Sequence, residues 1–365
     1  MPLTISAQDG LVDQITYFNN RVASRDVSNY YLVYNGEFAY NKSTSDGYPF
    51  GAVKRLDWYE KGVLSTLYIV FALKHPEKDD SDFMTVFYDT DRWHRGVAER
   101  AAEGARNHGL LNISADDFFD IDTTMPEDKV EQEKIGRLLK KLDTLITLHQ
   151  RKYEKLLNIK KSMLDKMFPQ NGVSVPEIRF KGFTDPWEQR KLGEVFEEYS
   201  EKNHAELPPL TIIQGGGTIR RDESERALQY DKSSLSNYKM VNKDDFIVHL
   251  RSFEGGLEKA SSQGIISPAY HTFHGEDVDS RFYYAYFRSK NFINKDLKPH
   301  VYGIRDGRSI DIEGMKTIRI PWASYPEQKS IGDFLTHLDT LITLHQRKLE
   351  KLQNIKKSCL EKMFV

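Results

Sequence analysis

The chain has 365 residues, of which 39% are hydrophobic and 29% charged, and its net charge is −2. This length predicts two or three domains with hydrophobic cores of their own. The apolar runs are too short to span a membrane, and residues 1–10 do not resemble a secretory signal. A lone cysteine excludes an intramolecular disulfide and a cysteine-rich zinc site. We therefore expect a cytoplasmic protein.

Residues 1–130 are expected to form a first globular domain. Aromatic and β-branched residues gather in 31–40 and 66–73, a composition that predicts short strands. His94 and His108 have no Cys or carboxylate at ligand spacing, so no metal site is predicted.

Residues 131–168 are expected to form one long helix. Apolar residues recur every three or four positions, and neither proline nor glycine interrupts residues 137–168. At 1.5 Å per residue this stretch would span roughly 48 Å. A helix of that kind needs a partner to cover its apolar stripe. Residues 169–186 hold three prolines and are expected to be a connector.

Residues 187–326 are expected to form a second globular domain, with a strand in 242–250 and either a strand or a helix in 281–287. Residues 327–365 then repeat the first helix, since 28 of 38 aligned positions in 131–168 and 327–364 are identical at an offset of 196. The chain is therefore a duplication, and the two helices are the obvious partners for an antiparallel coiled coil. The residues predicted at their interface are Leu138, Leu142, Leu145, Leu156, Phe334, Leu338, Leu341 and Leu352.

A weaker repetition links the globular parts, because the Pro-Leu-Thr-Ile run that begins at Pro2 recurs at Pro209. These parts have diverged while the helices have not. The predicted fold class is α/β (α+β), with two globular domains joined by two long helices. Two copies of one scaffold with different globular surfaces favour recognition of two different features.

Four segments resemble the specificity subunits of type I restriction–modification enzymes. They are the VPEIRFKGF…WEQRKLGEV opening, the GIISPAY segment, the IP…EQ junction and the LDTLITLHQRK…KMF helix. The resemblance implies that the globular parts are target-recognition domains, each reading one half of a split, asymmetric DNA site. One departure concerns the first domain, where Met1 alone precedes the PLTI run while about 22 residues precede it in the second. The usual opening of the first recognition domain is thus expected to be absent.

The same resemblance implies a scaffold with no catalytic activity of its own. Two modification subunits would use S-adenosylmethionine to methylate adenine, and restriction subunits would use ATP and Mg. The chain contains no adenine-methylase motif, dinucleotide-binding loop or Walker A sequence. The alternative is a coiled-coil adaptor or decoy that keeps the helices but no longer reads DNA.

Base reading requires polar side chains presented on loops at the groove edges. The Gly-rich run at 214–217 is expected to be a flexible surface turn. The residues predicted to contact DNA are Lys42, Ser43, Arg106 and Asn107 in the first domain, and Arg220, Arg221, Arg251, Ser252, Arg305 and Arg308 in the second. For any single Arg among them, an ordinary surface charge is at least as good an explanation.

Overall fold

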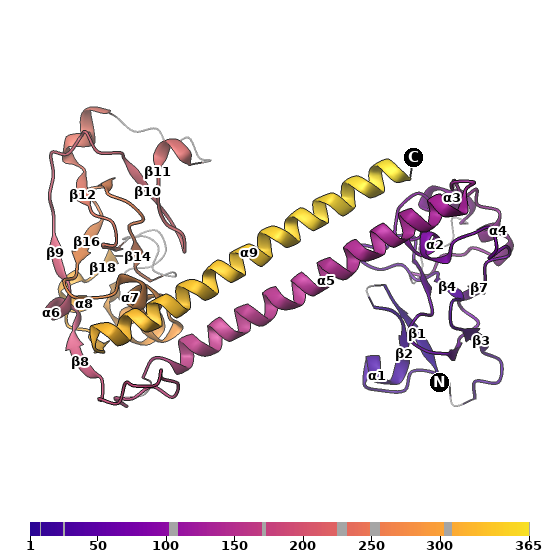
Figure 1. Ribbon diagram of the computed structural model, residues 1–365, viewed down its shortest axis with the longest axis horizontal. Helices are drawn as coiled ribbons and strands as arrows, with labels where there is room; N and C mark the ends of the chain where they lie inside the picture. The colour runs from indigo at the N-terminus through magenta and orange to yellow at the C-terminus, as the bar shows by residue number, and fades with distance from the viewer. Residues whose placement is uncertain are drawn as a thin grey trace. The chain divides into compact units, whose positions relative to one another are not determined.

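The computed structural model describes residues 1–365 except 8, 25, 102–108, 170–172, 225–231, 249–255, 303–308 and 365. The chain divides into two compact units, which are unit 1 (residues 1–150 and 347–365) and unit 2 (residues 151–346). Both long helices, α5 (Lys129–Lys166) and α9 (Tyr325–Met363), begin in one unit and end in the other (Figure 1). Among the described residues, no helix is long and apolar enough to cross a membrane.

Unit 1 holds the first globular domain, which consists of small antiparallel sheets and short helices. The pairings are β1–β2, β3–β6 and the three-stranded sheet β5-β4-β7. The strands are β1 (Leu3–Ser6), β2 (Gly10–Asp13), β3 (Tyr31–Tyr34), β4 (Phe38–Asn41), β5 (Ala52–Arg55), β6 (Lys61–Leu64) and β7 (Ile69–Phe71). The short helices are α1 (Gln14–Phe18), α2 (Ser81–Phe87), α3 (His94–Arg100) and α4 (Ala115–Phe119).

Unit 2 holds the second globular domain, with pairings β10–β11, β12–β15, β14-β13-β16-β9, β17–β18 and β19–β8. Its strands are β8 (Glu188–Lys191), β9 (Glu197–Tyr199), β10 (Leu210–Ile213), β11 (Gly217–Arg220), β12 (Lys239–Val241), β13 (Phe246–Val248), β14 (Glu258–Lys259), β15 (Gly264–Ile266), β16 (His271–His274), β17 (Val301–Tyr302), β18 (Ser309–Ile310) and β19 (Arg319–Trp322). Its short helices are α6 (Leu192–Val195), η2 (Arg221–Glu223), η3 (Lys232–Asn237), α7 (Ser280–Phe287), η4 (Phe292–Leu297), η5 (Lys298–His300) and α8 (Ile312–Lys316).

The two globular domains share one strand arrangement. Pro2 forms a parallel bridge to Val63 just before the β1–β2 hairpin, and Pro209 forms the same bridge to Ile265 just before β10–β11. Sheet β5-β4-β7 of the first domain corresponds to β14-β13-β16 of the second. The repetition of the Pro-Leu-Thr-Ile run therefore reflects a shared fold.

One of the sequence predictions needs refinement. Residues 280–287 form helix α7, so of the two alternatives for 281–287 the strand was wrong. Its N-cap, Asp279, accepts hydrogen bonds from the backbone N–H groups of Arg281 and Phe282, which fixes the helix start. The second domain also has β8 and β9, which pair with β19 and β16, and the described part of the first domain has no counterpart of either strand.

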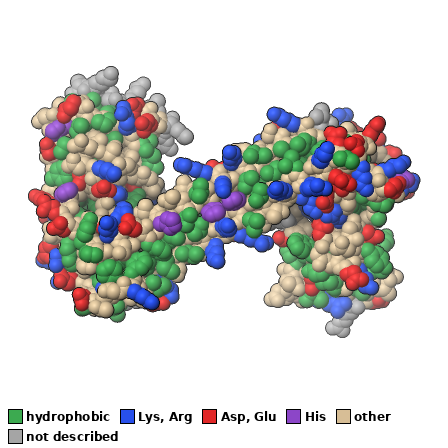
Figure 2. All heavy atoms as spheres, in the orientation of Figure 1, with side chains coloured by type: hydrophobic (Ala, Val, Ile, Leu, Met, Phe, Trp, Pro, Cys, Tyr) green, Lys and Arg blue, Asp and Glu red, His purple; other side chains and the backbone are tan. Residues whose placement is uncertain are grey.

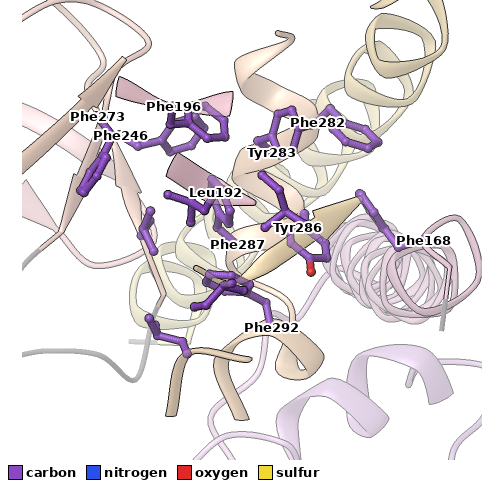
Figure 3. Close-up of a cluster of buried hydrophobic side chains, with 14 of the residues drawn as sticks. Phe168, Leu192, Phe196, Phe246, Phe273, Phe282, Tyr283, Tyr286, Phe287 and Phe292 are labelled. Atoms are coloured by element: carbon purple, nitrogen blue, oxygen red, sulfur yellow. The ribbon is translucent and has the colours of Figure 1, made fainter. Parts of the chain in front are cut away.

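The core of unit 2 is rich in aromatic side chains and includes one from the end of α5 (Figure 3). Phe168, two residues beyond α5, lies 5.0 Å from Phe282 and 5.6 Å from Tyr286 between ring centroids. In unit 1, Phe364 at the end of α9 lies 5.2 Å from Phe83 on α2. Each globular domain therefore packs against the long helix that follows it in the chain. It also packs against the phenylalanine at the end of the other long helix.

The buried residues of the long helices follow one stripe in both copies. In α5 they are Gln132, Ile135, Gly136, Leu139 and Leu142, and in α9 the equivalent residues Gln328, Ile331, Gly332, Leu335 and Leu338 are buried together with Glu327 and Ile342. In unit 1 an ion pair of 2.5 Å joins Lys356 to Asp143, and the equivalent Lys160–Asp339 pair lies in unit 2. Within each unit the two helix segments thus make matching contacts, as a duplication requires.

The junction between each globular domain and its helix is also repeated. The Gln132 side chain accepts a hydrogen bond of 2.7 Å from the Asp80 backbone and donates one to the Pro126 carbonyl. Gln328 makes the same two bonds, to the Asp279 backbone and the Ala323 carbonyl. Because Asp80 and Asp279 are the N-caps of α2 and α7, each buried glutamine holds the start of one domain helix against the long helix.

Candidate nucleic-acid interface

In the first domain, Lys42 and Ser43 directly follow strand β4 and lie beside residues 109–113. Ser43 forms an antiparallel bridge to Leu110, and the Leu111 N–H donates to the Lys42 carbonyl at 2.9 Å. Arg106 and Asn107 lie outside the described residues. Ser43 is exposed, and the Lys42 ammonium donates to the Ile113 carbonyl at 3.4 Å. The fold thus brings 42–43 next to 109–113.

In the second domain, Arg251 and Ser252 lie outside the described residues, as do Arg305 and Arg308. The elements that flank them are well defined. Strand β13, an inner strand of the four-stranded sheet, comes directly before 249–255 in the chain, and strands β17 and β18 come directly before and after 303–308. The predicted contacts at these four positions stay predictions.

The Gly-rich turn between β10 and β11 lies at the surface, as expected, and hydrogen bonds to a residue outside the turn anchor it. Glu258 is 4% exposed, and its carboxylate accepts hydrogen bonds from the Gly215 N–H at 2.8 Å and from the Tyr284 hydroxyl at 2.9 Å. Arg288 forms an ion pair with the same carboxylate. Gly217 has φ +72°, and a Cβ there would lie 2.7 Å from the Lys259 carbonyl oxygen. A buried acid and a close backbone approach therefore fix the position of this turn.

Arg220 and Arg221, which follow that turn, differ in their surroundings. The Arg220 guanidinium is half exposed and forms an ion pair with Asp222 at 2.8 Å, which raises its pKa. Arg221 donates to the Leu210 carbonyl and to the Tyr238 hydroxyl, and its guanidinium lies 5.2 Å from the Tyr238 ring centroid. Arg220 is the better placed of the two to reach a ligand, because Arg221 is engaged within the domain.

A cleft of about 940 Å³ in unit 1 lies between the first domain and the helix segments. Lys54 and Lys356 line it, and both form ion pairs, with Asp89 at 2.7 Å and with Asp143 at 2.5 Å. Figure 2 shows Lys and Arg side chains along the long helices and intermixed with Asp and Glu over the globular parts. His94 also lines the cleft, and burial lowers its pKa. The cleft is therefore polar but locally charge-balanced.

Sequence reasoning missed the acids that organise the second domain. Asp245 is 1% exposed and binds His274 at 2.7 Å and the Tyr199 hydroxyl at 2.5 Å. Burial and this neighbouring carboxylate raise the pKa of Tyr199. No spacing in the sequence links these three residues, because they come from β9, the start of β13 and the end of β16. Among the described residues there is no cluster of three or more metal-ligating side chains.

The residues predicted at the helix interface differ in exposure. Leu142 and Leu338 are buried, while Leu145, Leu156, Phe334, Leu341 and Leu352 are half-buried. Leu138 is 41% exposed, and its neighbour Leu139 is fully buried in the unit 1 core. Phe334, the counterpart of Leu138, packs edge-on against Phe180 of the connector, with 5.9 Å between ring centroids.

Comparison with known proteins gives a consistent family. Residues 184–354 match the family model of the type I restriction modification DNA specificity domain. The chain is 24% identical over 318 residues to the type I restriction enzyme MjaVIII specificity subunit of Methanocaldococcus jannaschii, covering 82% of this chain and 72% of that one. It is 25% identical over 242 residues to the putative type I restriction enzyme MjaX specificity subunit of the same organism, covering 62% of this chain and 55% of that one.

A solved structure has the same fold. The type I restriction-modification system S subunit from M. genitalium matches 91% of this chain and 84% of its own length, with a TM-score of 0.57 and 14% sequence identity. The family model covers the second domain and most of its helix, and the internal duplication extends the same architecture to the first. Residues 184–354 therefore belong to the type I restriction modification DNA specificity domain family, and the chain as a whole is similar to specificity subunits of type I restriction enzymes.

Proposed function

We propose that this chain reads a split, asymmetric DNA site, with each globular domain recognising one half in the major groove. The observation that carries the proposal is the duplication of a domain-plus-helix unit. The two domains share a strand arrangement and a glutamine junction, and they differ in their surface residues. A repeated scaffold with different surfaces suits recognition of two different sequences.

In the first domain the proposed reading surface is formed by Lys42, Ser43 and the neighbouring segment that carries Arg106 and Asn107. Lysine and arginine donate to guanine, and asparagine forms paired hydrogen bonds with adenine. The exposure of Ser43 and its pairing with Leu110 support this placement. In the second domain, Arg220, Arg251, Ser252, Arg305 and Arg308 are the corresponding candidates.

The chain itself is proposed to be non-catalytic. The long helices would seat two modification subunits, which bind S-adenosylmethionine and turn the target adenine out of the duplex before methylating it. Restriction subunits would bring ATP and Mg²⁺ to the same complex. The residues of this chain would position those subunits by fixing the register on DNA.

Methylome sequencing tests the proposal. Cells that express this chain together with its modification subunit are compared with cells that lack the chain. A gapped motif with N6-methyladenine in both half-sites is the expected result. A stable complex without any new methylated motif would instead identify a coiled-coil adaptor.

A further inference from the structure

The repeated helices differ most where they meet the globular domains. Ten of the 38 aligned positions differ, and six of these ten fall within residues 133–141 and their counterparts 329–337. Several of the six change charge, since Arg137 becomes Asp333 and Lys140 becomes Thr336. The buried glutamine and glycine of the junction are unchanged, so the six differences near the junction surround a constant pair of residues.

In unit 1 the junction pairs a carboxylate of the domain with a cation on the long helix. Asp82 is the second residue of α2, and its carboxylate lies 2.8 Å from Lys140 on α5. The same carboxylate lies 2.8 Å from Arg55 on β5. Burial alone would raise the pKa of Asp82, but hydrogen bonds from Lys140 and Arg55 outweigh it and lower that pKa. The carboxylate is therefore ionised and faces a cation on the helix.

In unit 2 the charges are reversed. Arg281 is the second residue of α7 and occupies the place that Asp82 has in α2. Its guanidinium pairs with Asp333 on α9 and with its own N-cap, Asp279. The hydrogen bonds that Arg281 donates to these two carboxylates raise its pKa. A cation on the domain thus faces an acid on the helix.

We propose that this reversed ion pair matches each recognition domain to its own helix. Crossing the partners would place Asp82 opposite Asp333, or Arg281 opposite Lys140 and Arg137, so each wrong combination brings like charges together. Exposed ion pairs each contribute little to stability. The free-energy difference between a matched and a mismatched junction is larger, because a mismatch loses the attraction and also adds a repulsion. The pairs act as positioning residues, and this role does not depend on which DNA sequence is read.

The test uses the full chain and rebuilds one junction with the residues of the other. In one variant, Asp333→Arg with Thr336→Lys gives α9 the two residues of α5. We expect this change to lower the unfolding midpoint by about 2–6 °C, from loss of the pair and repulsion of Arg281. Adding Arg281→Asp, which recreates the Asp-Ser-Asp run of the first domain, is expected to restore most of that loss.

The decisive quantity is the sign of the Arg281→Asp effect in the two backgrounds. It should lower the midpoint when α9 is unchanged and raise it when α9 carries the α5 residues. Glu276→Arg, an exposed charge reversal in the same domain, is the matched control and should not respond to the background. If Arg281→Asp has the same effect in both backgrounds, the matching proposal is wrong.

The second junction offers an independent version in case the first set folds poorly. Lys140→Asp should lower the midpoint, and Asp82→Arg should lower it less in that background than alone, because the new arginine faces the introduced carboxylate as well as Arg55. Additive effects of these two substitutions would likewise overturn the proposal, because a charge-matched pair must show coupling.

Discussion

Glu258 illustrates how one buried residue can hold a surface turn in place. It is almost fully buried under the turn at residues 215–217, pairs with Arg288 and accepts from Tyr284. We expect Glu258→Ala to lower the free energy of unfolding by about 2–3 kcal/mol, because it leaves Arg288 and the Gly215 N–H without their partner. Urea denaturation measures this change. The control is Glu223→Ala at an exposed position, which should change the free energy of unfolding by less than about 0.5 kcal/mol. Equal stability of both variants would refute an anchoring role.

Glu198 makes the second domain sensitive to acid. Burial raises its pKa, but hydrogen bonds from His271 at 2.6 Å and Lys316 outweigh burial, so the net pKa is lowered from about 4.5. A carboxylate with a depressed folded pKa stabilises the fold above its unfolded pKa, and this contribution is lost as pH falls through the folded pKa.

The comparison of wild type with Glu198→Gln isolates that contribution. The wild type should be more stable by up to about 1 kcal/mol at pH 6, and the difference should vanish at pH values well below 4.5. Thermal unfolding between pH 3 and pH 7 measures it. A difference that is constant over this range would contradict the assignment.

At the scale of the elements, a glycine decides how closely each domain approaches its helix. A Cβ on Gly136 would lie 2.6 Å from the Phe83 backbone nitrogen, and one on Gly332 would lie 2.5 Å from an Asp279 carboxylate oxygen. Glycine to alanine within a helix normally stabilises by up to about 1 kcal/mol. Here we expect Gly136→Ala to destabilise by about 1–3 kcal/mol, because the helix must shift away from α2.

Chemical denaturation of Gly136→Ala and Gly332→Ala measures this reversal of sign. Lys141→Ala, an exposed substitution on the same helix, should change stability by less than about 0.5 kcal/mol. Stabilisation by either glycine substitution would show that the domain can move off the helix without loss.

The long helices were predictable from sequence, and their side-chain contacts were not. Spacing alone placed the first helix at 131–168, against 129–166 in the structure. The pattern favoured Leu138 over Leu139, since both fit a spacing of three or four, and only packing against the first domain distinguishes them. Gln132 and Gly136 have no signal of their own, because their roles depend on the distant Asp80 and Phe83. The aromatic run of α7 suits strand and helix equally, and its cap decides between them.

At the scale of the whole molecule, two domains that read separately should be separable by mutation. We expect Lys42→Ala with Ser43→Ala to relax one half of the methylated motif and leave the other half unchanged. Loss of a base contact costs about 1–3 kcal/mol of discrimination at its own base pair. Methylome sequencing measures this, and exposed Lys78→Ala in the same domain is the control. Simultaneous loss of both halves would argue against independent reading.

The packing of Phe364 against α2 has a consequence for biosynthesis. The first domain leaves the ribosome early, yet its core includes a ring from the end of α9. At about 5–20 residues per second, the more than 200 residues between 150 and 364 take roughly 10–40 s to translate. Throughout that interval Phe83 and Phe87 lack their contacts with Phe364. The N-terminal domain is thus completed last, and a nascent chain that stops short of α9 presents an apolar surface to chaperones and proteases.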